Sequence, residues 1–484
     1  MKNRLLKGVV LLFVFYSGNA QNITQEMHQN KKPNVIYINV DDLGWMDTVT
    51  YGSKFYETPN IDQLAKSGIK FSRGYSAAAN CAPSRACLIS GQNTPRHGIY
   101  TVGNSDRGNT KTRKIIPIEN KEILADSVVT MAEMFKMEGY VTGTFGKWHL
   151  GKDPKTQGFD VNRGGANQGS PGGGGYFSPY NLPSLENGPV GENLTDRLTQ
   201  ESIKFITENK DKPFFVYLPF YAVHTRLETT AELEKKYSKK GGDKLQNNAV
   251  YAGMIETVDK NVGILIAALK ELHLENTLIV FTSDNGGIRD ISSQQPLRAG
   301  KGSYYEGGIR VPFIVSWKGE IVPNTISNTP ISNLDFYPTF MDILGCKLPG
   351  KLLDGQSILP ILKGEKAKER DLFFHFPIYL QAYNQKTDDG RDPLFRTRPG
   401  SVIIEGNWKL HQYFEDNALE LYNLETDLGE RHNLAKANPK KANALLQKLN
   451  NWREEIKAPV PTKLNTEYDA TYIAVKGGKK KLED

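Results

Sequence analysis

The sequence has only three cysteines among 484 residues, no internal repeat, and no apolar run beyond its N-terminus that is long enough to cross a membrane. A spanning helix needs about 20 apolar residues, so we expect none. The formal net charge is +7, and three of the cations, Lys2, Arg4 and Lys7, stand at the very start of the chain. The remaining excess is too small to indicate nucleic-acid binding, although it suits an anionic substrate.

The first twenty residues have the pattern of a secretory signal peptide. The three cations precede an apolar run over residues 8–16, and small residues follow up to Ala20, after which we expect cleavage. The apolar run is too short to span a membrane, and no cysteine stands at the cleavage point for lipid attachment. We therefore expect a periplasmic or secreted protein with no membrane partner.

The expected export raises the question of what the three cysteines do. An exported protein usually commits its cysteines to disulfides, yet Cys81, Cys87 and Cys346 cannot all pair within one chain. At least one thiol therefore needs another explanation. The sequence leaves open whether Cys87 and Cys346 are bridged.

Apolar segments rich in branched residues alternate with helical patterns along most of the chain. The runs NVIYINV, PFFVYLP and TLIVFTS are typical of strands buried on both faces, and long amphipathic segments stand between them. This alternation predicts an α/β fold with a large, mostly parallel sheet sandwiched by helices. From about Asp371 the strands become shorter and alternating, and a helix follows over 439–456, which predicts a smaller α+β domain with an antiparallel sheet.

The length fits this division, because it exceeds what one hydrophobic core normally supports. We expect a signal peptide at 1–20, a catalytic domain at 21–365 and a C-terminal α+β subdomain at 366–484. The glycine cluster at 164–177 is interpreted as a long loop.

Polar side chains follow two of the predicted strands at the point where each strand ends. Asp41 and Asp42 follow NVIYINV, and Asp284 and Asn285 follow TLIVFTS. Because the carboxyl ends of parallel strands meet at one edge of a sheet, these groups could converge. Carboxylate and amide oxygens suit a hard cation, Ca²⁺ or Mg²⁺. The alternative is that both segments are ordinary polar turns.

Cys81 precedes Pro83 and Arg85 at the start of a predicted helix. Proline is favoured in a first helical turn, and the free N–H groups there attract an anion. A structural cysteine beside a surface arginine is one reading. A nucleophilic thiolate is another, but its softness matches a hard cation poorly.

The run CAPSRACLISGQNTPRHG resembles the Cys-x-Pro-Ser-Arg signature of the type I, formylglycine-dependent sulfatases of the alkaline phosphatase superfamily. Further stretches follow in that family's order over most of the chain, among them NVIYINVDDLGW, GYVTGTFGKWHLGK, FTSDNGG and LRAGKGSYYEGGIRVPFIVSW. Asn80 and Phe145 are small departures. The resemblance implies sulfate ester hydrolysis. It also implies that a formylglycine-generating or anaerobic sulfatase-maturating enzyme converts Cys81 to formylglycine (3-oxoalanine), whose hydrate is the nucleophile.

The same resemblance assigns roles to individual positions. It implies that Asp41, Asp42, Asp284 and Asn285, with the modified Cys81, contact a divalent cation, calcium or alternatively magnesium. Arg85 would orient the hydrated residue, and Asp284 would accept its proton. The positions around the sulfate are Lys147, His149, His224 and Lys301. Of these, His224 with Lys301 would protonate the leaving alcohol, and His149 would take the proton that allows sulfate to be expelled.

The substrate is the least determined part. The chain resembles bacterial carbohydrate sulfatases, which implies a sulfated polysaccharide of marine algae, of the ulvan or carrageenan type, with glycosaminoglycans as the second choice. The candidates for contacting the sugar are Arg226, Arg289, His375, Arg391 and Arg398. Two alternatives stay open: a phosphoester or phosphonate hydrolase of the same superfamily, and a non-catalytic glycan-binding protein in which Cys81 stays a thiol.

Overall fold

The computed structural model describes residues 32–348 and 350–472. The predicted signal peptide lies outside the described residues. The described residues from Asn34 to Tyr472 belong to one compact unit with two main sheets and two small ones.

The larger sheet has eight strands in the order β5-β4-β6-β1-β7-β8-β2-β9. All its neighbouring pairs are parallel except the two that β8 makes, with β7 and with β2. All seven residues of β1 are buried, as expected for a strand covered on both faces. The strands are β1 (Asn34–Val40), β2 (Ile69–Phe71), β4 (Val141–Phe145), β5 (Val161–Arg163), β6 (Phe214–Pro219), β7 (Thr277–Ser283), β8 (Phe313–Trp317) and β9 (Thr325–Ser327).

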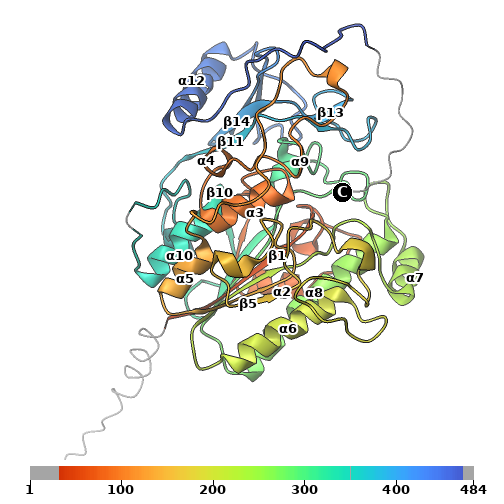
Figure 1. Cartoon of the computed structure of the whole chain (residues 1–484), viewed down its shortest axis with the longest axis vertical. Helices are drawn as coiled ribbons and strands as arrows, with labels where there is room; N and C mark the ends of the chain where they lie inside the picture. Colours follow the sequence, from red (N-terminus) through yellow and green to blue (C-terminus); the bar gives the residue numbers. More distant parts are fainter. Residues whose placement is uncertain (1–31, 349, 473–484) are drawn as a thin grey trace, which may run out of the picture. The chain divides into compact units, whose positions relative to one another are not determined.

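Helices cover both faces of this sheet (Figure 1). Because side chains alternate along a strand, Ile36 and Ile38 of β1 pack in one core cluster, whereas Val35 and Tyr37 pack in another. The first cluster contains residues of α2 (Pro59–Lys66), α6 (Leu194–Glu208), α7 (Ala231–Lys240) and α8 (Ala249–Glu271). The second contains residues of α3 (Cys81–Ser90), α5 (Met131–Met137), α10 (Phe336–Leu344) and α11 (Leu359–Leu362). The predicted fold class is confirmed.

The C-terminal part is a four-stranded antiparallel sheet in the order β11-β14-β15-β16. Leu410 and Leu421 on one face of this sheet pack against Leu445 and Leu449 of the last helix. The other face packs toward the larger N-terminal part of the chain, where Phe376 stacks on Tyr304. The elements are β11 (Asp371–Phe376), β14 (Gly400–Glu405), β15 (Trp408–Tyr413), β16 (Leu419–Asn423) and α12 (Pro439–Glu455).

Short elements complete the described chain. Two small sheets pair β3 (Gly74–Tyr75) with β10 (Ile331–Ser332) and β12 (Leu380–Gln381) with β13 (Phe395–Thr397). The short helices are α4 (Thr94–His97), α9 (Glu306–Ile309), η1 (Val49–Tyr51), η2 (Thr110–Thr112), η3 (Pro154–Gln157), η4 (Gly172–Gly174) and η5 (Asn333–Asp335). Among the described helices, none combines the length and the apolar character that a bilayer span requires.

Candidate active site

The polar residues at the ends of β1 and β7 lie together. These strands pair in parallel with Val40 opposite Ser283, so the residues that follow them emerge at the same edge. Carboxylate oxygens of Asp41, Asp42 and Asp284 and the Sγ atom of Cys81 all lie within 4.8 Å of one another. The structure therefore brings together groups from distant parts of the sequence in a buried cluster.

Cys81 is the first residue of α3, and the whole helix is buried. Its Sγ atom lies 3.9 Å from Oδ1 of Asp42. Burial and the nearby charge of Asp41 raise the pKa of the Cys81 thiol to about 12. Burial among these carboxylates thus favours the neutral thiol of an unmodified Cys81 over the thiolate.

Each of the three carboxylates has a buried cation beside it. Nζ of Lys147 lies 2.6 Å from Asp41, and Nζ of Lys301 lies 2.8 Å from Asp42. The guanidinium of Arg85 lies 2.8 Å from Asp284 and donates a second hydrogen bond, 2.9 Å long, to the carbonyl oxygen of Lys147. The charges balance pair by pair, which is what allows so many ionised groups to be buried together.

The carboxylates nevertheless differ in their proton affinity. Burial and the charge of Asp284 raise the pKa of Asp41 to about 8. Burial also acts to raise the pKa of Asp42, but Lys301 and His224 outweigh it and hold that pKa below its usual range. A further positive charge beside Asp41 would keep that carboxylate ionised.

The donor set fits a hard divalent cation. Oδ1 of Asp41 and Oδ1 of Asn285 are buried acceptors without a hydrogen-bond partner among the described residues. Two such oxygens are costly unless a ligand satisfies them. Oxygen ligands from carboxylates and an amide are those that Ca²⁺ and Mg²⁺ prefer.

Two histidines border the same cluster. His224 follows β6, and its Nε2 atom lies 3.1 Å from Nζ of Lys301. His149 follows β4, and its Nδ1 atom is buried without a hydrogen-bond partner among the described residues. Burial, reinforced by the neighbouring lysines, lowers the pKa of His224 to about 3 and also holds that of His149 well below its usual range. Both imidazoles are therefore neutral at physiological pH.

The glycine-rich loop packs directly on His149. The amide of His149 donates a 2.9 Å hydrogen bond to the carbonyl oxygen of Ala166. At Gly169 an added Cβ atom would lie only 2.6 Å from Cε1 of the imidazole. The absence of a side chain at Gly169 is what permits this approach.

The predicted sugar-contacting arginines each have a carboxylate partner. Arg226 is exposed and lies 3.4 Å from Glu228. The remaining pairs are Arg289 with Asp389 at 3.2 Å, Arg391 with Asp416 at 2.6 Å, and Arg398 with Glu415 at 2.7 Å. In the part of the chain that the structure describes, no hydrogen bond or ion pair joins these side chains to the buried cluster.

His375 needs a correction. It is a buried residue of β11, and its two ring nitrogens lie 2.8 Å from Oγ of Ser401 and 2.9 Å from the carbonyl oxygen of Pro459. Both nitrogens are satisfied inside the C-terminal part, so His375 has no free group to offer a substrate. Its place in the structure is that of a core histidine.

Sequence reasoning missed Asp47, which supports the segment that follows β1 and carries Asp41 and Asp42. The buried carboxylate accepts hydrogen bonds from Gly44 N, Tyr251 Oη, Ser292 Oγ and Gln294 Nε2, with lengths of 2.6–2.9 Å. Tyr251 also donates to the carbonyl oxygen of Asp42. The only signal of Asp47 in the sequence is that it follows Asp41 and Asp42 closely.

A second buried charge cluster, also missed, fixes the segment that carries Lys301. Nζ of Lys409 lies 2.9 Å from both Glu306 and Glu430. Glu306 also accepts hydrogen bonds from Tyr75 Oη at 3.0 Å and from Arg310 at 3.2 Å. Because Lys409 belongs to β15 and Glu306 to α9, this cluster joins the C-terminal sheet to the catalytic segment.

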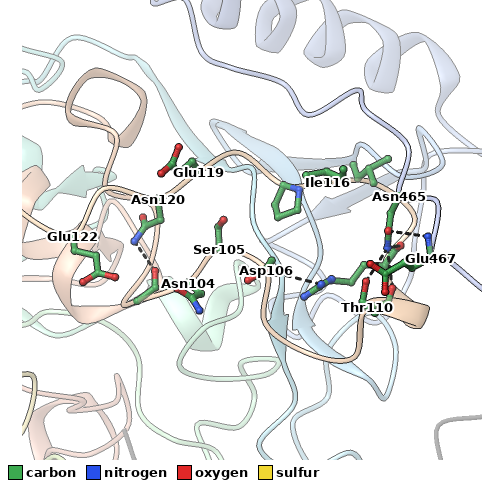
Figure 2. Close-up of a pocket in the computed structure, with 14 residues that line it drawn as sticks. Asn104, Ser105, Asp106, Thr110, Ile116, Glu119, Asn120, Glu122, Asn465 and Glu467 are labelled. Carbon is green, nitrogen blue, oxygen red and sulfur yellow. Dashed lines mark hydrogen bonds and ion pairs between the residues drawn. The ribbon is translucent and has the colours of Figure 1, made fainter.

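A separate pocket of ≈ 540 Å³ lies among residues 103–122 and 465–467 (Figure 2). Its charged lining residues are Asp106, Glu119, Glu122 and Glu467, against a single cation, Arg113. Arg113 is 3.3 Å from Asp106. A negative pocket repels an anionic ligand, so this pocket is a poor candidate for binding a sulfate group.

Comparison with known proteins gives the family. Residues 33–346 match the family model described as "Sulfatase", and residues 300–458 match "N-sulphoglucosamine sulphohydrolase, C-terminal". A protein of Formosa agariphila named "Sulfatase" is 35% identical over 92% of each chain. The human "N-acetylgalactosamine-6-sulfatase" is 31% identical over 71% of this chain and 68% of its own length.

Solved structures agree. The crystal structure of Ps i-CgsB is similar with a TM-score of 0.72 and 29% identity, covering 90% of this chain and 95% of that one. The phosphonate monoester hydrolase of Agrobacterium radiobacter shares the fold alone, with a TM-score of 0.67, 19% identity, and coverage of 89% of this chain and 100% of that one. The chain belongs to the sulfatase family and is a sulfatase, an enzyme that hydrolyses sulfate esters.

Proposed function

We propose that this enzyme removes sulfate from a sulfated carbohydrate, with Cys81 as the precursor of a formylglycine nucleophile. The observation that carries the proposal is the convergence of Cys81 with three carboxylates and three buried cations at one edge of the sheet. A charge-balanced cluster of this kind becomes positive once a divalent cation is added. It would then hold an anionic sulfate ester.

Two groups that the chain does not itself contain complete this chemistry. A divalent cation held by Asp41, Asp42, Asp284 and Asn285, calcium or alternatively magnesium, would supply Lewis acidity, and the hydrated formylglycine at position 81 would supply the attacking oxygen. Arg85 is placed to orient residue 81, since both lie in the first turns of α3. Lys147 and Lys301 would bind sulfate oxygens while negative charge builds on them.

The two histidines and Lys301 would move the protons. Lys301 stays charged, because Asp42 raises its pKa well above the usual value against the effect of burial. Its proton can reach the leaving alcohol directly or through the neutral imidazole of His224, which lies 3.1 Å away. His149 is neutral with an unpartnered nitrogen, and it would accept a proton once the negative charge of a bound sulfate offsets the cations that lower its pKa.

A polysaccharide of marine algae is the substrate class that we favour, of the carrageenan or ulvan type. Support comes from Ps i-CgsB, which is 29% identical to this chain. Its structure has also been solved in complex with k-i-k-neocarrahexaose. The similarity to the human N-acetylgalactosamine-6-sulfatase makes a glycosaminoglycan the second choice. We also propose that Arg226, Arg289 and Arg398 contact the sugar. Their ion pairs with carboxylates lie outside the buried cluster.

We also propose export after removal of residues 1–20, with Cys81 converted by a maturating enzyme. The boundary between the catalytic and C-terminal parts is proposed near residue 365, between α11 and β11.

Sulfate release from a panel of carrageenan, ulvan and glycosaminoglycan oligosaccharides tests the activity, with Cys81→Ala as the inactive control. Mass spectrometry of the tryptic peptide 74–85 reports the conversion of Cys81. Release from phosphate esters and not from sulfate esters would favour the phosphoester alternative. Turnover by protein that keeps an intact thiol would overturn the formylglycine proposal.

A further inference from the structure

The loop between β12 and β13 packs against the segments that carry the catalytic groups. Its Asn384 donates a 2.8 Å hydrogen bond to Asp290, and Thr387 donates to the same carboxylate. Asp290 follows Asn285 by five positions, just after the metal-binding strand end. The loop is thus held beside the catalytic cluster from outside the catalytic sheet.

Arg396 of β13 ties this loop to Lys301. Its guanidinium donates a 3.3 Å hydrogen bond to the carbonyl oxygen of Lys301 and a 3.0 Å bond to that of Gln381. Arg396 is buried, and at Gly302 an added Cβ atom would lie 2.8 Å from its Nη1 atom. Its position relative to the catalytic lysine is therefore fixed by packing as well as by hydrogen bonds.

The ring of Tyr383 lies on this guanidinium. Cζ of Arg396 is 3.3 Å from the ring centroid, which is a close cation–π stack. The amide of Tyr383 donates a 2.6 Å hydrogen bond to Asp388, which fixes the backbone of the loop. The side chain is half-buried, and no hydrogen bond from its hydroxyl group is found among the described residues. One ring face is thus covered by Arg396, and the hydroxyl remains available.

Tyr383 is thus linked to the segment of Lys301 through one residue. Its ring stacks on the guanidinium of Arg396, and Arg396 donates to the carbonyl oxygen of Lys301.

We infer that Tyr383, backed by Arg396, forms the wall of the subsite for the sugar ring that bears the sulfate ester. This inference rests on the proposed carbohydrate activity and adds a specificity-determining residue to it. The ring would stack on the apolar face of the sugar, and its hydroxyl would hydrogen-bond a sugar hydroxyl. Because Arg396 holds both Tyr383 and the Lys301 carbonyl, stacking would set the leaving oxygen at a fixed distance from Lys301.

The test compares Tyr383→Ala and Tyr383→Leu with wild type on the oligosaccharide that wild type desulfates. We expect kcat/KM to fall by about tenfold or more in both variants, since each loses the aromatic face. Tyr383→Phe keeps that face and should lose about threefold or less. Rates are normalised to the formylglycine content of each preparation, and thermal unfolding checks that each variant is folded.

Inhibition by inorganic sulfate separates this role from a structural one, because sulfate fills the anion pocket and leaves the sugar subsite empty. We expect its inhibition constant to change by less than about twofold in every variant. Trp408→Ala is the matched control, an aromatic residue of β15 that carries Lys441 over its ring, and its kcat/KM should match wild type.

Two results would overturn the inference: an unchanged kcat/KM in Tyr383→Ala, or an equal loss of affinity for the oligosaccharide and for inorganic sulfate. If wild type releases sulfate from no saccharide, the proposed function itself is wrong and the subsite is wrong with it. Wild-type activity with no effect of Tyr383 contradicts the subsite alone.

Discussion

Replacing Lys409 by methionine tests whether the buried charge cluster holds the C-terminal sheet to the catalytic segment. Lys409, Glu306 and Glu430 have no exposed side-chain surface. The methionine keeps the length and apolar part of the side chain but removes the charge between the two carboxylates. Both glutamates then stay buried without their common partner.

The expected cost is about 3–5 kcal/mol, the range for removing one partner of a buried ion pair. Adding Glu430→Gln should recover about 1–2 kcal/mol, because without Lys409 the buried Glu430 must take up a proton at neutral pH, whereas a glutamine is already neutral. The remaining carboxylate, Glu306, still has Arg310 at 3.2 Å and the hydroxyl of Tyr75 at 3.0 Å. The double variant should therefore be more stable than Lys409→Met alone.

Equilibrium unfolding in urea, followed by tryptophan fluorescence, measures these differences. Lys448→Met is the matched control, because Lys448 also bridges two carboxylates, those of Asp371 and Glu405, but its side chain is 48% exposed. It should cost less than about 1 kcal/mol. The reasoning is refuted if Lys409→Met costs no more than Lys448→Met, or if the double variant is less stable than the single one.

Three further predictions concern the active site and its support. Gly169→Ala should lower kcat at least about tenfold by displacing His149. Gly173→Ala is the control and should keep wild-type activity, because its Cβ atom would meet nothing within 4 Å. Equal rates of the two variants would contradict the close approach of Gly169 to His149. Burial raises the pKa of Glu430 to about 7, so the native state binds its proton more tightly than the unfolded chain. The stability that this provides is complete below the ordinary carboxyl pKa and is lost as pH rises to about 7. The thermal midpoint of wild type should therefore fall over this pH range, and that of Glu430→Gln should not. Identical pH profiles of the two proteins would count against this prediction. The groups facing Glu430 are Lys409, His411 and Glu306. Removing divalent cations with a chelator should lower the thermal midpoint, and calcium should restore it; a midpoint indifferent to both would speak against the ion site.

The sequence could predict those site residues that directly follow apolar strands. Asp41 and Asp284 each directly follow an apolar run that is clearly a strand. Parallel pairing of two strands places the residues that follow them at the same edge of the sheet. Cys81 and Lys301 were found from motifs. These are local signals, and the structure assembles the corresponding residues at one edge.

The supporting residues could not be found in this way, because their roles depend on contacts between distant segments. Lys409 and His411 alternate with apolar residues in β15, a pattern typical of a solvent-exposed face, yet both are buried against the catalytic part. Tyr383 lies in an irregular loop with no periodicity. His375 shows the opposite error, since a polar residue in the β11 sequence looked available for binding and is buried instead.

The burial of Cys81 has a consequence for the order of events during biosynthesis. The residue is 1% exposed, and Asp284, which has a carboxylate oxygen within 4.8 Å of its Sγ atom, is synthesised long after it. An enzyme that oxidises this thiol needs access to the bare peptide around it. On the proposal that Cys81 is converted to formylglycine, this conversion would compete with chain collapse, and a host that folds this protein faster than it modifies it would accumulate well-folded but inert molecules.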